Sequence, residues 1–82
     1  MEASIRIGLG RKLREVRQKL GYTQEKLADL TAIDYKYIQR IEGKTPPDIR
    51  VETIARLARA LKTTPSKLLD FQEGSQNKQH RE

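Results

Sequence analysis

The sequence lacks cysteine and tryptophan, has a single histidine, and contains no apolar run longer than two residues. Without cysteine there is no disulfide and no thiolate metal site, which fits a reducing cytoplasm. The short apolar runs exclude a membrane-spanning helix, and the N-terminus lacks the apolar segment of a secretion signal. The single histidine, His80, lies in a polar C-terminal segment. We therefore expect no metal site and a cytoplasmic protein.

Patterns typical of catalysis are also missing. A hydrolytic triad would have no base, because His80 falls outside the part expected to fold. Gly8 and Gly10 precede a helical pattern but follow no strand, so they do not form a phosphate-binding glycine loop. The acidic residues are scattered, and no two of them converge as a catalytic pair would. The sequence therefore predicts neither enzymatic activity nor a cofactor.

Positive charge is what the sequence has in excess. Lys and Arg total 17 against 11 Asp and Glu, giving a net charge of +6. A small basic domain attracts polyanions, because binding releases the counterions held by the polyanion. The charge alone leaves two interpretations open, nucleic-acid binding and a merely solvated basic surface.

The length and the apolar pattern predict one small all-α domain. Eighty-two residues, 35% of them hydrophobic, are enough for a single thin core. Apolar residues at helical spacing cover residues 5–71, and no alternating run is long enough for a sheet. Residues 72–82 contain no apolar residue, so we expect a disordered polar tail there.

The first helical pattern has a poorly defined start. Gly8 and Gly10 weaken its first turn, so the helix is expected to begin between residues 5 and 10, with Ser4 available as a cap. Gly21 ends it. Its apolar row consists of Ile5, Leu9, Leu13, Val16 and Leu20.

Two short helices follow, the first after the N-cap Thr23 and the second after the N-cap Asp34. Together they form a helix-turn-helix pattern over residues 24–43. Pro46 and Pro47 prevent the next loop from being helical. A fourth helix is expected from about residue 51 to 61, and a fifth opens with Thr64 and Pro65. The fourth helix should face inward with Val51, Ile54, Leu57, Ala58 and Leu61, and the fifth holds Leu68, Leu69 and Phe71.

The third helix, residues 35–42, divides into an apolar arc and a polar arc. Ile38 and Ile41 lie on the arc expected to face the core, with Tyr37 at its border and its hydroxyl available to a phosphate. The opposite arc carries Tyr35, Lys36, Gln39 and Arg40. These side chains match the donors and acceptors of base edges. A solvated polar face is the alternative, although the like charges four positions apart favour a polyanion partner.

Two further pairs of residues carry predictions. Thr23 and Gln24 begin a helix, where free N–H groups and the helix dipole favour a phosphate; an ordinary solvated helix start is the alternative. Arg17 and Glu42 lie on core-facing sides of their helices and have no nearer partner. Since a partly buried charge must be paired, we predict that Arg17 and Glu42 form a structural ion pair.

A pattern of residues extends from about residue 9 to residue 71. It consists of Leu13-Arg14-x-x-Arg17-x-x-x-Gly21-x-Thr23-Gln24-Glu25-x-Leu27-Ala28, Tyr37-Ile38-x-x-Ile41-Glu42, Glu52-Thr53-Ile54 and Ala60-Leu61. This pattern resembles the Cro/phage-repressor helix-turn-helix family, also called the xenobiotic response element family. Its short stand-alone members, such as the controller proteins of restriction–modification systems, are similar in size.

The resemblance implies a compact five-helix, lambda-repressor-like domain that binds double-stranded DNA. The second helix would cross the DNA backbone and the third would enter the major groove. The implied base contacts are Tyr35, Lys36, Gln39 and Arg40. The implied phosphate contacts are Thr23, Gln24, Tyr37 and Lys44. The family's salt bridge corresponds to Arg17 and Glu42. Family members usually have glycine where this chain has Ala32, so either Ala32 adopts a left-handed conformation at a cost of ~1 kcal/mol or the turn differs.

The predicted function is sequence-specific DNA binding for transcriptional control, by a homodimer that pairs through helices four and five on a partly palindromic operator. Two alternatives remain. One is a protein-binding module of the same fold, such as an antitoxin. The other is a nonspecific nucleic-acid or RNA binder, although the glycine–aromatic sheet motifs and GXXG loops of RNA-binding domains are absent.

Overall fold

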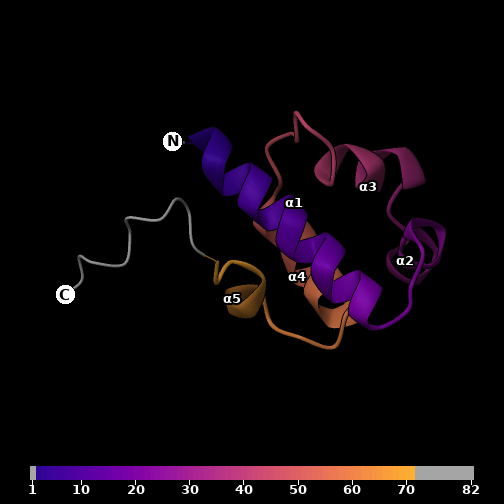
Figure 1. The fold of residues 1–82 in the computed structure, drawn as a ribbon. Coiled ribbons are helices and arrows are strands. Elements are labelled where there is room, and N and C mark those ends of the chain that lie inside the picture. Colours follow the sequence, from indigo (N-terminus) through magenta and orange to yellow (C-terminus); the bar gives the residue numbers. More distant parts are fainter. Residues whose placement is uncertain (1, 72–82) are drawn as a thin grey trace.

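The computed structural model describes residues 2–71, with side chains described from residue 5 onward. That part of the chain forms five helices and no strand (Figure 1). The helices are α1 (Glu2–Lys19), α2 (Gln24–Thr31), α3 (Tyr35–Ile41), α4 (Val51–Ala60) and α5 (Pro65–Leu68). The expected all-α, five-helix architecture is confirmed. The expected disordered tail, including His80, lies outside the described residues.

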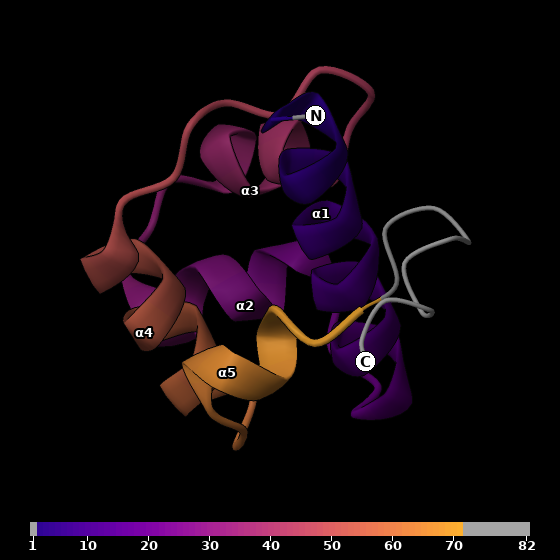
Figure 2. The same ribbon diagram turned by 90° about the vertical axis from the view of Figure 1, so that its left-hand side faces the viewer.

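The long helix α1 crosses the bundle, with α4 behind it and α2 and α3 to one side (Figure 1). The view in Figure 2 shows α2 beneath α3 and α5 below α2, and α2 contacts both α3 and α4. Every helix contributes to one core, whose largest fully buried side chains are Leu13, Leu27, Ile38, Ile41, Leu57, Leu61 and Leu68. None of the described helices is both long and apolar enough to span a bilayer.

The start of α1 differs from the sequence prediction. The helix begins at Glu2 and runs through Gly8 and Gly10 without a break. Both glycines are sites of close approach: a Cβ at Gly8 would collide with the ring of Phe71, and a Cβ at Gly10 would collide with the carbonyl oxygen of Ile41. Tertiary contact therefore offsets the roughly 1 kcal/mol that each glycine costs a helix. The predicted start between residues 5 and 10 was wrong for this reason.

Some residues expected in the core are exposed. Val51 was expected to face inward, but its side chain is 78% exposed. It lies in the first turn of α4, roughly 70° from the centre of the buried arc when residues are spaced ~100° apart. Leu69 is 42% exposed, whereas Leu68 is fully buried and Phe71 packs against the core beside α1. The last segment therefore directs two of its three large apolar side chains inward.

The predicted caps of α2 and α3 are present. Thr23 Oγ1 accepts a hydrogen bond from the Lys26 N–H at 2.9 Å, and Asp34 Oδ1 accepts one from the Lys36 N–H at 3.2 Å. Between the two helices Ala32 has φ 59° and ψ 28°, the left-handed conformation. The first of the two alternatives for this turn is therefore correct, and the turn carries the strain of a Cβ in that region.

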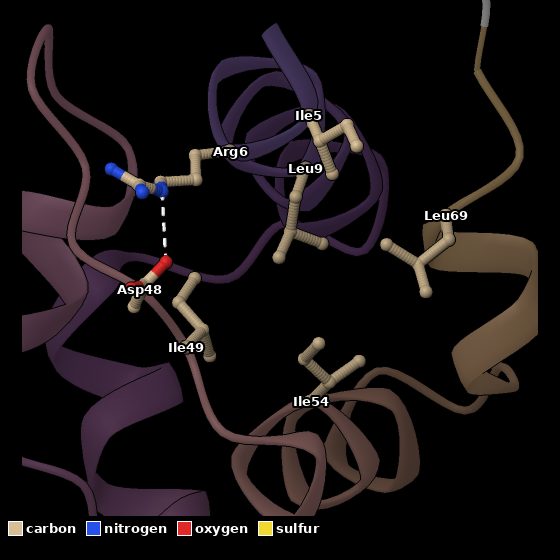
Figure 3. A pocket seen from close by; sticks show the side chains of 7 residues that line it. All are labelled: Ile5, Arg6, Leu9, Asp48, Ile49, Ile54 and Leu69. Atoms are coloured by element: carbon tan, nitrogen blue, oxygen red, sulfur yellow. Dashed lines mark ion pairs between the residues drawn. The ribbon is translucent and has the colours of Figure 1, made fainter. Parts of the chain in front are cut away.

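The proline-containing segment, residues 44–50, is fastened to two helices. Arg6 of α1 pairs with Asp48, with 3.0 Å between Nε and Oδ1 (Figure 3). The hydroxyl of Tyr37 in α3 donates to the carbonyl oxygen of the same residue at 3.3 Å. Both contacts end at Asp48, so this residue sets the path of the segment between α3 and α4.

Replacing Ala32 with glycine should stabilise the fold. Glycine adopts the left-handed conformation without strain, which relieves about 1–2 kcal/mol, while its greater freedom when unfolded returns about 0.5–1 kcal/mol. We expect Ala32→Gly to raise the free energy of unfolding by about 0.5–1 kcal/mol in chemical denaturation. The matched control is Ala55→Gly within α4, which should lower it by about 1 kcal/mol. A lower stability of Ala32→Gly than of the wild type would contradict the strained turn.

Candidate nucleic-acid interface

A buried ion pair joins the C-terminal half of α1 to the residue that follows α3. Arg17 Nε donates to Glu42 Oε2 at 2.8 Å and Nη2 donates to Oε1 at 2.8 Å, a bidentate arrangement. Arg17 Nη1 also donates to the carbonyl oxygen of Tyr22 at 2.7 Å. The side chains of Arg17 and Glu42 are 9% and 3% exposed. The structure thus brings together the two residues that the sequence analysis paired.

The environment of Arg17 favours its charged form. The hydrogen bonds from its guanidinium to Glu42 raise the pKa of Arg17 above its ordinary value, against the opposing effect of burial, and the charge of the carboxylate adds to the rise. Since Arg17 is charged at any physiological pH, the pair is permanent on its cationic side. Its role in the fold is to hold the end of α3 against α1.

Gln24 extends this ion pair to α2, a link that sequence analysis missed. Its Nε2 donates to Glu42 Oε1 at 3.0 Å, so the side chain turns inward from the first residue of α2. Gln24 was expected to contact a phosphate, and the structure instead engages its amide nitrogen with a carboxylate. The two residues are 18 positions apart, and no local pattern indicates such a contact. Glu42 therefore connects α1, α2 and α3.

The exposed face of α3 is polar, and its opposite face is firmly packed. Ile38 and Ile41 are both 0% exposed. The four residues expected to contact bases, Tyr35, Lys36, Gln39 and Arg40, are all exposed. Within the described chain neither Lys36 nor Arg40 forms an ion pair. The predicted division of α3 into a core arc and a solvent arc therefore holds.

Two of these exposed residues are linked. Gln39 Nε2 donates to the hydroxyl of Tyr35 at 3.1 Å, one turn apart on α3. The contact orders both side chains on the outer face and leaves the amide oxygen of Gln39 directed to solvent as an acceptor. Lys36 and Arg40 stay free on either side of this pair. The face thus offers an ordered polar pair between two mobile cations.

The remaining predicted phosphate contacts lie at the edges of this face. Thr23 is exposed before the first turn of α2, where its Oγ1 already caps the helix. Tyr37 is half-buried against the core with its hydroxyl on Asp48, which agrees with its expected place at the border of the core. Lys44 is exposed just beyond the end of α3, next to α1. No group of residues that could hold a metal ion occurs in the described part of the chain.

The arrangement defines a class of protein. A short helix held by its apolar face, preceded by a capped helix and a tight turn, is the helix-turn-helix unit of DNA-binding proteins. The helix-turn-helix family matches residues 13–68, most of the described chain, and the protein belongs to this family. It is a DNA-binding helix-turn-helix transcriptional regulator, and its family and relatives are regulators, not enzymes.

Particular relatives agree with this class. The control protein C.BamHI of Bacillus amyloliquefaciens is 36% identical over 72 residues, which cover 87% of this chain and 88% of the relative. The crystal structure of the restriction–modification controller protein C.AhdI from Aeromonas hydrophila has a TM-score of 0.72 at 33% identity, covering 77% of this chain and 94% of that protein. A hypothetical transcription factor from Neisseria, NHTF, has a TM-score of 0.74 at 29% identity over 79% of this chain and 74% of its own.

Removing Glu42 should destabilise the fold strongly. Glu42→Ala leaves the Arg17 guanidinium buried without a counter-charge, and breaking a buried pair in this way costs roughly 3–5 kcal/mol. Chemical denaturation measures the loss. The control Glu15→Ala removes the exposed i,i+4 pair with Lys19, whose atoms are 3.8 Å apart, and should change stability by less than about 0.5 kcal/mol. Equal stability of Glu42→Ala and the wild type would contradict the structural role of the pair.

Proposed function

We propose that this protein binds a specific double-stranded operator with α3 in the major groove. One observation supports this most directly: α3 is held by two fully buried isoleucines and presents only polar groups to solvent. A helix of this diameter fits the major groove, where each base pair shows a distinct set of donors and acceptors. The free cations on α3 gain a partner when a polyanion approaches.

The base contacts follow from the chemistry of each side chain. Arg40 is suited to a bidentate contact with guanine O6 and N7, and Lys36 to a base or a neighbouring phosphate. The outward amide oxygen of Gln39 can accept from an adenine or cytosine amino group while its nitrogen stays on Tyr35. Tyr35, at the first turn, can pack on a thymine methyl or donate to a phosphate.

The phosphate contacts lie along the rim of the face. The hydroxyl of Thr23 and the free backbone N–H groups at the start of α2 point toward the side from which DNA would approach, and the dipole of α2 favours an anion there. Because the side chain of Gln24 is engaged with Glu42, its contribution is through the backbone N–H. Lys44 and the hydroxyl of Tyr37 complete the proposed set at the other end of α3.

A homodimer is proposed because one such helix covers only a few base pairs. The apolar residues left exposed on α4 and α5, Val51 and Leu69, are candidates for pairing. Leu69 faces Ile5 and Ile54 across an apolar groove between α1, α4 and α5 (Figure 3). Two copies related by a two-fold axis would place their α3 helices about one DNA turn, ~34 Å, apart on a partly palindromic operator. Acting on the DNA of the cell, the regulator would be cytoplasmic.

Arg40→Ala should weaken operator binding and relax base preference. Losing a bidentate base contact costs about 1–3 kcal/mol, which is about 5- to 150-fold in affinity. Titrations with the operator, selected beforehand from random duplexes, and with random duplex measure both quantities. Arg59→Ala, which removes an exposed cation from the last turn of α4, is the matched control and should alter neither by more than about twofold. An unchanged ratio of operator to random affinity for Arg40→Ala would exclude this base contact.

Charged residues at the proposed pairing surface should produce a monomer. Val51→Glu and Leu69→Glu place a carboxylate where apolar side chains would meet, and burying an unpaired charge is strongly unfavourable. Sedimentation equilibrium should show a dimer for the wild type and a monomer for the two variants. Leu20→Glu, at an exposed apolar position at the end of α1, should remain dimeric. A wild type that stays monomeric at every concentration, alone and on DNA, would refute the dimer.

A further inference from the structure

Three cations converge where α1 meets the end of α3. Arg11 and Arg14 of α1 and Lys44, just after α3, line a hollow of about 330 Å³, which we call the basic hollow. Its other lining residues are Ile7, Glu42 and Gly43. Gly10 makes the approach close, because a Cβ there would collide with the carbonyl oxygen of Ile41. The arrangement is thus a consequence of tight helix packing.

The positive charge of the basic hollow is not neutralised by the protein. None of its three cations forms an ion pair with another residue in the described range. The carboxylate in its lining, Glu42, is occupied by the bidentate contact with Arg17. Arg11 and Arg14 are three positions apart on one helix face, where like charges repel. An anion in the hollow would relieve this repulsion.

The basic hollow adjoins the proposed DNA face. Arg14 also borders a second hollow, of about 420 Å³, that has Thr23 at the start of α2 and Tyr35 at the start of α3 on its rim. The cations of α1 therefore extend the polar surface of the helix-turn-helix around its edge. Glu25 is the acidic residue on that rim whose charge opposes an anion, and it lies on the α2 side, outside the lining of the basic hollow.

We infer that the basic hollow binds a phosphate of the operator backbone, contacted by Arg11 and Arg14 together with Lys44. The inference rests on the proposed function, and it adds α1 to a contact surface otherwise formed by residues 23–44. Guanidinium groups suit this role, because their planar array of donors matches the oxygens of a phosphate. A backbone contact fixes position and adds affinity, but it carries no base preference.

Neutral substitutions of the two arginines test the inference. Arg11→Gln and Arg14→Gln should each weaken operator binding about eightfold at 0.1 M salt and lower the slope of log affinity against log salt by about 0.9, the value for one lost phosphate contact. The ratio of operator to random-duplex affinity should not change. Arg14→Lys should keep most of the slope, because it keeps the charge.

Lys19→Gln is the matched control. It removes one positive charge from the opposite flank of α1, at an exposed position in neither hollow, and should change affinity by less than about twofold. All four variants alter exposed side chains, so their melting temperatures should equal that of the wild type.

The outcomes separate this inference from the proposed function. If Arg11→Gln and Arg14→Gln bind as tightly as Lys19→Gln with an unchanged salt slope, the phosphate contact by α1 is refuted. A change in the operator-to-random ratio would also refute a contact with the backbone alone. In both cases the proposed function stands if Arg40→Ala loses operator preference. It fails if the wild type and Arg40→Ala bind operator and random duplex equally.

Discussion

The position of α3 depends on one buried carboxylate. Glu42 accepts two hydrogen bonds from Arg17 of α1 and one from Gln24 of α2, each between 2.8 and 3.0 Å. A helix of seven residues has too few internal hydrogen bonds to be stable alone, so its place is set by tertiary contacts. The two isoleucines of α3 supply the apolar contact, and Glu42 fixes the end of the helix. A buried pair of this kind adds little net stability over an apolar substitute, and its value here is orientation.

The same carboxylate connects fold and function. Because Gln24 is the first residue of α2, its bond to Glu42 ties the end of the helix proposed to meet the DNA backbone to the helix proposed to enter the groove. Backbone contacts and base contacts are then held in one geometry before DNA is bound. Such pre-organisation reduces the entropy lost on binding. The ordered pair of Tyr35 and Gln39 on the outer face acts in the same direction.

Local chemistry determined the parts of the fold that sequence could predict. Thr23 and Asp34 cap their helices as their side chains allow, and Ile38 and Ile41 fall on the buried side by helical periodicity. The pairing of Arg17 with Glu42 followed from the need to neutralise a buried charge. These predictions required only neighbouring residues or a single physical rule.

The failures share a dependence on distant contacts. Gly8 and Gly10 weaken a helix start in isolation, but in the fold they admit the ring of Phe71 and the carbonyl oxygen of Ile41. Gln24 turns inward because Glu42 arrives beside it from α3. The cations of α1 surround the helix in projection, and only the packing against Lys44 shows that two of them share a hollow with it. Selection of bound duplexes from a random pool, by the wild type and by a Lys36→Ala, Arg40→Ala double variant, tests the central claim most directly. The account predicts that the wild type enriches a motif with two related halves and that the double variant does not. Enrichment of the same motif by both proteins would show that the outer face of α3 does not determine the DNA sequence bound.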